Sequence, residues 1–163
     1  MGSQQSHNGI RTNARVNRYE PNGESSRGTR SDVRLSLPAR PENVAVIRHV
    51  LGAFAEALRL PPEQVEDMRL AVTEACTNVV RHAYHRESEP GPIDVIIRPD
   101  DDRLHLIVSD RGEGIGPSPD ADGPGLGLPL IAALADSVEM QPGPSRGSRL
   151  TMSFTRRPHL GAA

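Results

Sequence analysis

The sequence predicts an α+β fold in which helices cover one face of a sheet, and three observations lead to this prediction. Several short segments alternate apolar and polar residues, which is typical of half-buried strands. Two longer segments repeat apolar residues every three or four positions, as amphipathic helices do. The helical segments lie between the strand segments along the chain. We therefore expect a two-layer α/β sandwich with a mixed sheet and helices on one face.

The first half of the predicted domain contains one strand and two long helices. The strand is expected at 32–37, where every second residue is apolar. The helices are expected at about 41–59 and 62–85. Each begins with a proline, which suits the first turn of a helix because its fixed φ is already helical.

The second half is expected to be richer in strands. Two β-rich runs, 93–98 and 103–109, are separated by three aspartates and predict an antiparallel hairpin. A loop rich in Gly, Pro and Asp is expected next, followed by a short helix and two further strands, at 110–124, about 126–135, 137–141 and 148–155.

The two ends of the chain differ from this domain in composition. Residues 1–31 are polar and nearly free of aliphatic side chains, which predicts a disordered tail. The tail holds five arginines and two glutamates, a charge of +3. Since the net charge of the whole chain is −2, the other residues together carry −5. Such a basic tail could touch an acidic partner or nucleic acid, or it could simply be solvated. The predicted organisation is an N-terminal tail at 1–31, one domain at 32–157 and a C-terminal tail at 158–163.

Composition excludes several classes of function. All 19 basic residues are arginine, so Schiff-base chemistry, a Walker A loop and the lysine-dependent protein-kinase site are ruled out. Aromatic residues make up only 2% of the chain, which argues against base-stacking surfaces. The net charge of −2 gives no reason to expect nucleic acid or an anionic membrane as a partner. With one cysteine, Cys76, and no long apolar run, the sequence predicts a cytoplasmic protein.

The first candidate site lies on the second long helix. Glu74, Asn78 and His82 are spaced i, i+4 and i+8, and Arg81 is close by, so these side chains should form one polar ribbon. A carboxylate beside a carboxamide can position a hydroxyl group and complete a magnesium shell, because magnesium prefers oxygen ligands and keeps several waters. The alternative is an ordinary solvated helix face.

The second candidate site follows a predicted strand. Asp110 stands at the strand end and could accept a hydrogen bond from an exocyclic amine such as that of adenine. Gly112 and Gly114, which precede Ile115, would let a flat ring approach the backbone. The alternative is a tight turn, in which Asp and Gly are favoured in any case.

The third candidate site is a glycine-rich loop that runs into the short helix. Unpaired N–H groups at a helix start, together with the helix dipole, attract phosphate. This loop reads Gly125, Leu126, Gly127 and Leu128, which does not match the dinucleotide fingerprint G-x-G-x-x-G. The alternative is a flexible loop with a helix cap.

The order of these three motifs, followed by Gly147-Ser148 before the last strand, carries a family resemblance. It resembles the GHKL (Bergerat) ATP-binding fold of gyrase-type ATPases, ninety-kilodalton heat-shock chaperones, sensor histidine kinases and mismatch-repair ATPases. The resemblance covers about residues 32–157. Within that superfamily, the stretches AVTEACTNVVRHAY and GLGLPLIAALADSVEM are most similar to the small bacterial anti-sigma factor serine kinases.

The resemblance implies a role for each candidate residue. Glu74 would be the general base acting on a partner's serine, Asn78 would ligate Mg²⁺, and Asp110 would bind the adenine amino group. The remaining nucleotide contacts would come from glycines, backbone amides, a hydroxyl and two side chains that match positions near the phosphates in some members: Gly112, Gly114, Ile115, Gly125, Leu126, Gly127, Leu128, Ser148, Arg81 and His82.

The resemblance also implies ligands and partners. The cofactors would be ATP and Mg²⁺, and the partners a sigma factor and a small serine-bearing antagonist of the anti-sigma factor. Relatives in this branch often pair as dimers, so a homodimer is implied as well. Two departures from the pattern are Ser148, where relatives have threonine, and a short loop with Asp120 and Asp122, which leaves the role of residues 115–124 as a lid open.

Two other functions remain open from the sequence. The domain could be a non-catalytic module whose partner-binding surface is shaped by ATP. It could also be a detached ATPase domain of a sensor histidine kinase, with the phosphoacceptor histidine supplied by another chain.

Overall fold

The computed structural model describes residues 32–113, 127–143 and 146–157. The predicted tails at 1–31 and 158–163 and most of the loop expected at 110–124 lie outside the described residues. Five strands and three helices occur in the described part, in the order β1 (Val33–Pro38), α1 (Pro41–Ala57), α2 (Pro62–His82), β2 (Pro92–Pro99), β3 (Arg103–Asp110), α3 (Gly127–Leu134), β4 (Ser137–Pro142) and β5 (Ser148–Thr155).

The strands form one sheet in the order β1-β2-β3-β5-β4, and every neighbouring pair is antiparallel. The α+β class and the two layers are confirmed, whereas the prediction of a mixed sheet is wrong. The strands β3 and β4, joined through α3, do run in the same direction. They never pair, because β5 folds back from β4 and inserts between them.

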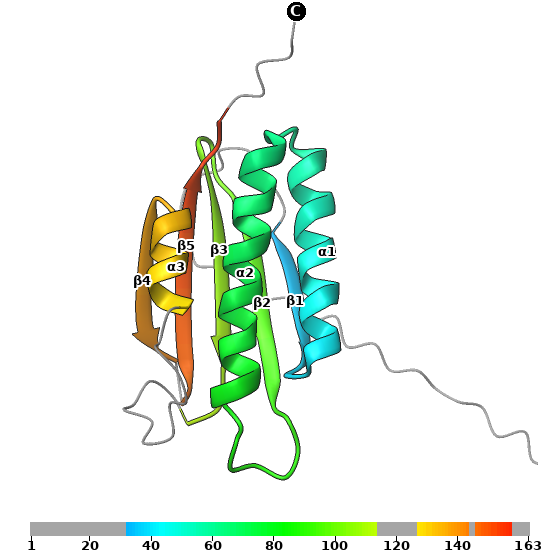
Figure 1. Ribbon diagram of the computed structural model, residues 1–163, viewed down its shortest axis with the longest axis vertical. Helices are drawn as coiled ribbons and strands as arrows, with labels where there is room; N and C mark the ends of the chain where they lie inside the picture. Colours follow the sequence, from blue (N-terminus) through cyan, green and yellow to red (C-terminus); the bar gives the residue numbers. More distant parts are fainter. Residues whose placement is uncertain (1–31, 114–126, 144–145, 158–163) are drawn as a thin grey trace, which may run out of the picture.

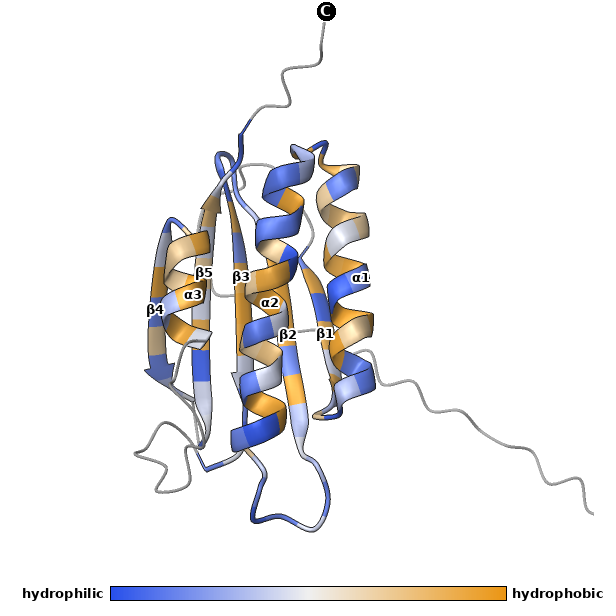
Figure 2. Ribbon diagram, in the orientation of Figure 1, coloured by the Kyte–Doolittle hydropathy of each residue, from blue (hydrophilic) through white to orange (hydrophobic). Residues whose placement is uncertain are grey.

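All three helices lie against the same face of the sheet (Figure 1), with α2 crossing its centre. Alternate residues of β2 and β3 point into this layer and are buried: Ile93, Val95, Ile97, Leu104, Leu106 and Val108. Hydrophobic stretches recur along the helices and the central strands (Figure 2). The core is therefore aliphatic and lies between the helices and the sheet, while no helix of the described part covers the second face of the sheet.

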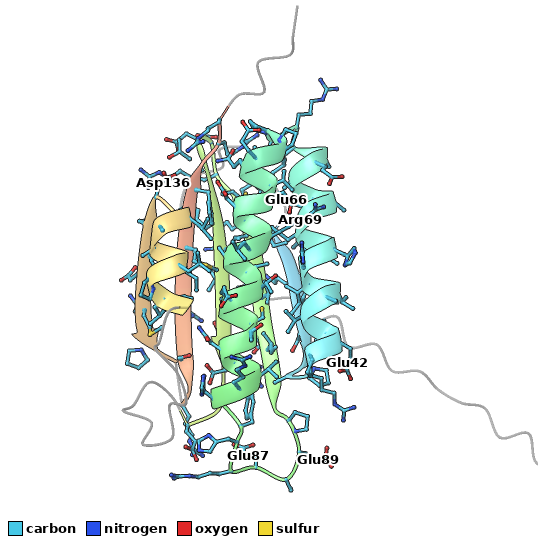
Figure 3. The ribbon with its side chains drawn as sticks, viewed as in Figure 1. Glu42, Glu66, Arg69, Glu87, Glu89 and Asp136 are labelled. Atoms are coloured by element: carbon cyan, nitrogen blue, oxygen red, sulfur yellow. The ribbon has the colours of Figure 1, made fainter. Side chains whose placement is uncertain are left out.

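The two long helices pack side by side and share an ion-pair cluster. Both begin with a proline in the first turn, as predicted. Arg69 on α2 contacts Glu56 on α1 at 2.9 Å and Glu66 on its own helix at 2.6 Å. Figure 3 shows Arg69 and Glu66 where the two helices face each other. This cluster ties α1 to α2 on the outer surface of the helical layer.

Helix α2 ends at His82, three residues before the predicted end at 85. The Ala83 N–H still donates to Val79, but its carbonyl accepts a bond of 3.0 Å from the N–H of Glu113. The backbone after β3 has thus taken the acceptor that another helical turn would have used. Local sequence carries no sign of this long-range contact.

Cys76 points from α2 into the core and is fully buried, as its apolar surroundings predicted. Burial raises the pKa of its thiol to about 12, since the thiolate would lose its hydration. Across residues 32–113, 127–143 and 146–157, none of the helices has the length and apolar character needed to cross a membrane.

Candidate nucleotide-binding site

Asp110 ends β3 and is only 4% exposed. One carboxylate oxygen accepts a hydrogen bond from the Gly112 N–H at 2.9 Å, and the other accepts one from the Ser148 hydroxyl at the start of β5. Each carboxylate oxygen can accept more than one bond, so this group can still receive a donor from a ligand. The structure thus brings together Asp110, Gly112 and Ser148, three of the residues predicted to contact a nucleotide.

Two glycines make this arrangement sterically feasible. Gly147 has a φ of +81°, and a Cβ there would lie 2.2 Å from the Asp110 carbonyl oxygen. A Cβ on Gly112 would lie 1.9 Å from the carbonyl oxygen of Ala83. Because both obstacles are backbone atoms, neither can move aside easily. Glycine is therefore required at both positions for β3, β5 and the end of α2 to approach this closely.

Tyr84 connects the end of α2 to the start of β2 and to the residue after β3. The sequence analysis did not assign it a role. Its hydroxyl donates to the carbonyl of Pro92 at 2.7 Å and accepts from the N–H of Arg111 at 2.8 Å. The side chain is 7% exposed, and burial raises its pKa above the ordinary value of 10.0. The sequence offered one signal for this role. Tyr84 is one of very few aromatic residues, it lies in an apolar helical pattern, and a buried tyrosine needs a partner for its hydroxyl.

The phosphate end of the predicted site is formed where α2 meets α3. A Cβ on Gly127, the first residue of α3, would lie 3.0 Å from the side-chain nitrogen and 3.3 Å from the side-chain oxygen of Asn78. The described part of the third sequence motif thus meets the first motif. The start of α3, where unpaired N–H groups favour phosphate, lies against a carboxamide.

Glu74 lies one turn before Asn78 on the same side of α2, and both side chains are half-buried. No ion pair or hydrogen bond holds the Glu74 carboxylate within the part of the chain that the structure describes. Along α2, Ala83 at the Asp110 end lies about 7.5 Å beyond Asn78, and Glu74 lies about 6 Å before it. Three groups are therefore arranged in order beside α2. The buried Asp110 carboxylate lies near its C-terminal end, the start of α3 lies at Asn78, and the Glu74 carboxylate, unpaired in the described ranges, lies one turn further back.

The other predicted residues are placed less centrally. Arg81 is exposed and lines a groove between α1 and α2, whereas Asn78 faces α3. The single polar ribbon predicted from sequence spacing is therefore divided between two sides of α2. His82 and Leu128 are exposed, and Gly114, Ile115, Gly125 and Leu126 lie outside the described residues.

The donor set suits a magnesium nucleotide better than a bare metal ion. Among the described residues, no three acidic, histidine or cysteine side chains gather into a metal cluster. The Asn78 carboxamide supplies one hard oxygen, which suffices for magnesium when phosphates and water complete its shell. Gly127, at the start of α3, is half-buried and lies beside this carboxamide.

Comparison with known proteins agrees with this geometry. The family model "Histidine kinase-like ATPase domain" matches residues 37–154. The serine-protein kinase RsbW of Bacillus pumilus (strain SAFR-032) is 36% identical over 76% of this chain and 84% of its own. RsbW of Bacillus subtilis (strain 168) is 35% identical over the same shares, and RsbW of Staphylococcus epidermidis is 35% identical over 68% and 79%.

Solved structures support the fold. A crystal structure of the RsbU and RsbW domains of a Mycobacterium tuberculosis protein matches 78% of this chain with a TM-score of 0.63 and 22% identity. The match spans about one third of that longer chain, 33%. The SiaB–SiaC complex from Pseudomonas aeruginosa matches 75% of this chain and 88% of its own, with a TM-score of 0.57 and 17% identity. The chain therefore belongs to the histidine kinase-like ATPase family and, within it, to the serine-protein kinases of the RsbW type.

Proposed function

We propose that this chain is a magnesium-ATP-dependent serine-protein kinase that binds a sigma factor and phosphorylates a small antagonist protein on serine. The observation that carries the proposal is the contact between Asn78 and Gly127. It sets the start of α3, a favourable phosphate site, beside the helix that carries the Glu74 carboxylate. The relatives named serine-protein kinase support the same chemistry.

The buried end of the site would hold the adenine ring. Asp110 would accept a hydrogen bond from the adenine amino group, while Ser148 and the Gly112 N–H keep its carboxylate oriented. Because this carboxylate is already fixed by two donors, little ordering entropy is lost on binding. Gly112 would contribute through its N–H, because the space beside its Cα is taken by the Ala83 carbonyl. Gly114 and Ile115 stay predicted members of this pocket.

The phosphates would lie at the start of α3. Backbone amides of Gly127 and Leu128 would contact them, and Gly125 and Leu126 stay predicted contacts. Asn78 would supply a protein oxygen to Mg²⁺. ATP would supply the phosphoryl group, and the metal would neutralise its charge.

Glu74 would act on the attacking hydroxyl. Its carboxylate lies one helical turn from Asn78, is half-buried, and has no partner in the described ranges, so it is available to accept a proton. As the serine oxygen of the antagonist bonds to phosphorus, its proton would pass to Glu74 and the bond to the leaving diphosphate would break. Positioning and charge neutralisation would account for most of the rate, as expected for phosphoryl transfer.

The catalytic assignment is tested with Glu74→Gln, which keeps size and removes the base. We expect phosphoryl transfer to an antagonist to fall by about 10²- to 10⁴-fold while ATP affinity changes by less than about threefold. Glu63→Gln, at an exposed position in the first turn of the same helix, is the matched control. Unchanged transfer by Glu74→Gln would contradict the role of Glu74. ATP binding without transfer in the unaltered protein would favour the non-catalytic module.

The partners are tested by capture from the native cytoplasm with and without magnesium-ATP. We expect a sigma factor to be recovered with nucleotide present, and a small protein that becomes phosphorylated on serine. Recovery of a histidine-bearing phosphoacceptor instead would favour the detached histidine-kinase domain. Arg81 and His82 stay predicted phosphate neighbours, and a homodimer and a cytoplasmic location stay predictions as well.

A further inference from the structure

The helix-free face of the sheet, turned away from the viewer in Figure 1, contains a pocket of about 380 Å³. It lies where β3 ends and takes residues from β1, β2, β3 and β5. Four arginines line it, Arg34, Arg111, Arg146 and Arg149, and Asp94 is its one carboxylate besides the buried Asp110. For a chain whose net charge is −2, this is a pronounced local excess of positive charge.

The strand register sets the width of this arginine pocket. One row of side chains crosses four strands, and its members are Ser36, Asp94, Ser109 and Arg149. The neighbouring row places Arg34 on β1 level with Ile96 on β2. From β1 to β5 the pocket crosses three strand spacings, about 14 Å. The strands that carry these arginines therefore present positive charge over a width that suits carboxylates spread along a peptide.

The arginines are available for a ligand. Arg34 pairs with Asp32 at 2.9 Å and Arg111 with Asp94 at 3.0 Å, and both arginines are more than 60% exposed. Exposed pairs of this kind stabilise weakly and exchange readily for other partners. Neither Arg146 nor Arg149 forms an ion pair within residues 32–113, 127–143 and 146–157. The buried Nε of Arg149 also has no hydrogen-bond partner among them.

We propose that this arginine pocket binds a segment of a partner protein that carries two or more Asp or Glu side chains. The carboxylates would pair with Arg149, Arg146 and Arg111, and Ile96 would supply an apolar floor. Strand alternation places Asp110 and Ser148 toward the helices and Arg149 on the opposite face. The arginine pocket therefore lies behind the proposed adenine end, and it does not depend on the proposed kinase activity.

The test uses the full chain, saturating magnesium-ATP and a fluorescently labelled hexaglutamate peptide. Arg149→Gln should weaken peptide binding by at least about tenfold, because a charged hydrogen bond is lost. The matched control is Arg59→Gln, which removes the same charge at the exposed connection between α1 and α2 and should change binding less than about twofold. All variants keep the five arginines of residues 1–31, so any peptide binding by these residues is common to all of them.

Further variants and probes keep the test decisive. Arg146→Gln alters an exposed side chain and should also weaken binding, even if Arg149→Gln disturbs β5. Arg149→Lys should recover part of the affinity. Equal losses in the Arg149 and Arg59 variants would overturn the proposal. Displacement of the peptide by inorganic phosphate at equal concentration would also overturn it. The proposal would fail as well if the unaltered chain bound no peptide and Arg149→Gln changed only self-association.

Discussion

The two ends of the candidate site are built differently. At the proposed adenine end, Asp110 is buried, both of its oxygens accept hydrogen bonds, and Gly147 allows the backbone of β5 to touch that of β3. At the reaction end, Glu74 and Asn78 are half-buried on one face of α2, and Glu74 has no partner in the described ranges. The first end is complete within the fold, whereas the second would be completed by its ligand.

This difference teaches where stability and activity are separable. Residues at the proposed adenine end hold elements together as well as a ligand, so a change of shape there should alter folding, whereas an isosteric change such as Asp110→Asn should alter binding alone. Glu74, at the proposed reaction end, has no hydrogen bond or ion pair in the described ranges, so changing it should affect chemistry with little effect on folding. Exposed and half-buried polar positions of this kind usually change stability by less than about 0.5 kcal/mol.

The largest effect on stability is expected for Gly147→Ala. The new Cβ would meet the Asp110 carbonyl oxygen at 2.2 Å, and alanine at a φ of +81° is strained. Left-handed strain of about 1–2 kcal/mol and overpacking of about 1–3 kcal/mol predict a loss of about 2–5 kcal/mol in the free energy of unfolding. Urea denaturation measures this loss.

Gly52→Ala is the matched control. The three atoms nearest to its Cβ would all belong to the Arg69 guanidinium, which is part of a flexible side chain, and alanine favours the helix that contains it. We expect its free energy of unfolding to stay within about 1 kcal/mol of the unaltered protein. Equal losses in the two variants would show that the contact between β3 and β5 has no special importance.

A smaller effect, on binding rather than folding, is expected for Asp110→Asn. The amide can still accept from the Gly112 N–H and can donate to the Ser148 oxygen, so the fold should be kept. The charged acceptor for the adenine amine is lost, which should lower ATP affinity by about 10- to 100-fold in calorimetry. Exposed Asp101→Asn serves as the control. Unchanged affinity for Asp110→Asn would place the adenine elsewhere.

The smallest effect is expected for Tyr84→Phe, which removes the bonds to Pro92 and Arg111 and should cost about 1–2 kcal/mol. Burial raises the pKa of Tyr84 above 10.0, so the folded state favours the neutral phenol. Its contribution is present below pH 10 and is lost as the pH rises further, because the unfolded phenol ionises first. Above pH 10 the unaltered protein should therefore lose stability more steeply than Tyr84→Phe. Parallel pH profiles would contradict this role.

Local patterns predicted the helices and strands to within a few residues, because aliphatic periodicity reports directly on which side of an element is buried. The prediction failed where distant segments decide the outcome. The end of α2 depends on Glu113 bonding to Ala83, and the antiparallel sheet depends on where β5 inserts. Neither contact can be predicted from the pattern of residues next to it in the sequence.

The site was predicted in part for the same reason. Sequence placed Asp110 and Gly112 together because they are neighbours, and the resemblance added Ser148. Spacing on a helix could not show that α1 lies on the side of Arg81 and α3 on the side of Asn78. Tyr84 was missed because its partners are backbone groups, the Pro92 carbonyl and the Arg111 N–H, which no side-chain pattern indicates.

The sealed position of Cys76 has a practical consequence. The chain has a single thiol, and it lies in the same turns of α2 as the proposed reactive carboxylate. With a pKa of about 12 and no exposed surface, that sulfur can react with an aqueous alkylating reagent only when the helix lifts from the sheet. The rate at which Cys76 is alkylated would therefore report how often the helical layer opens. A bound ligand that bridges α2 and α3 should slow this alkylation.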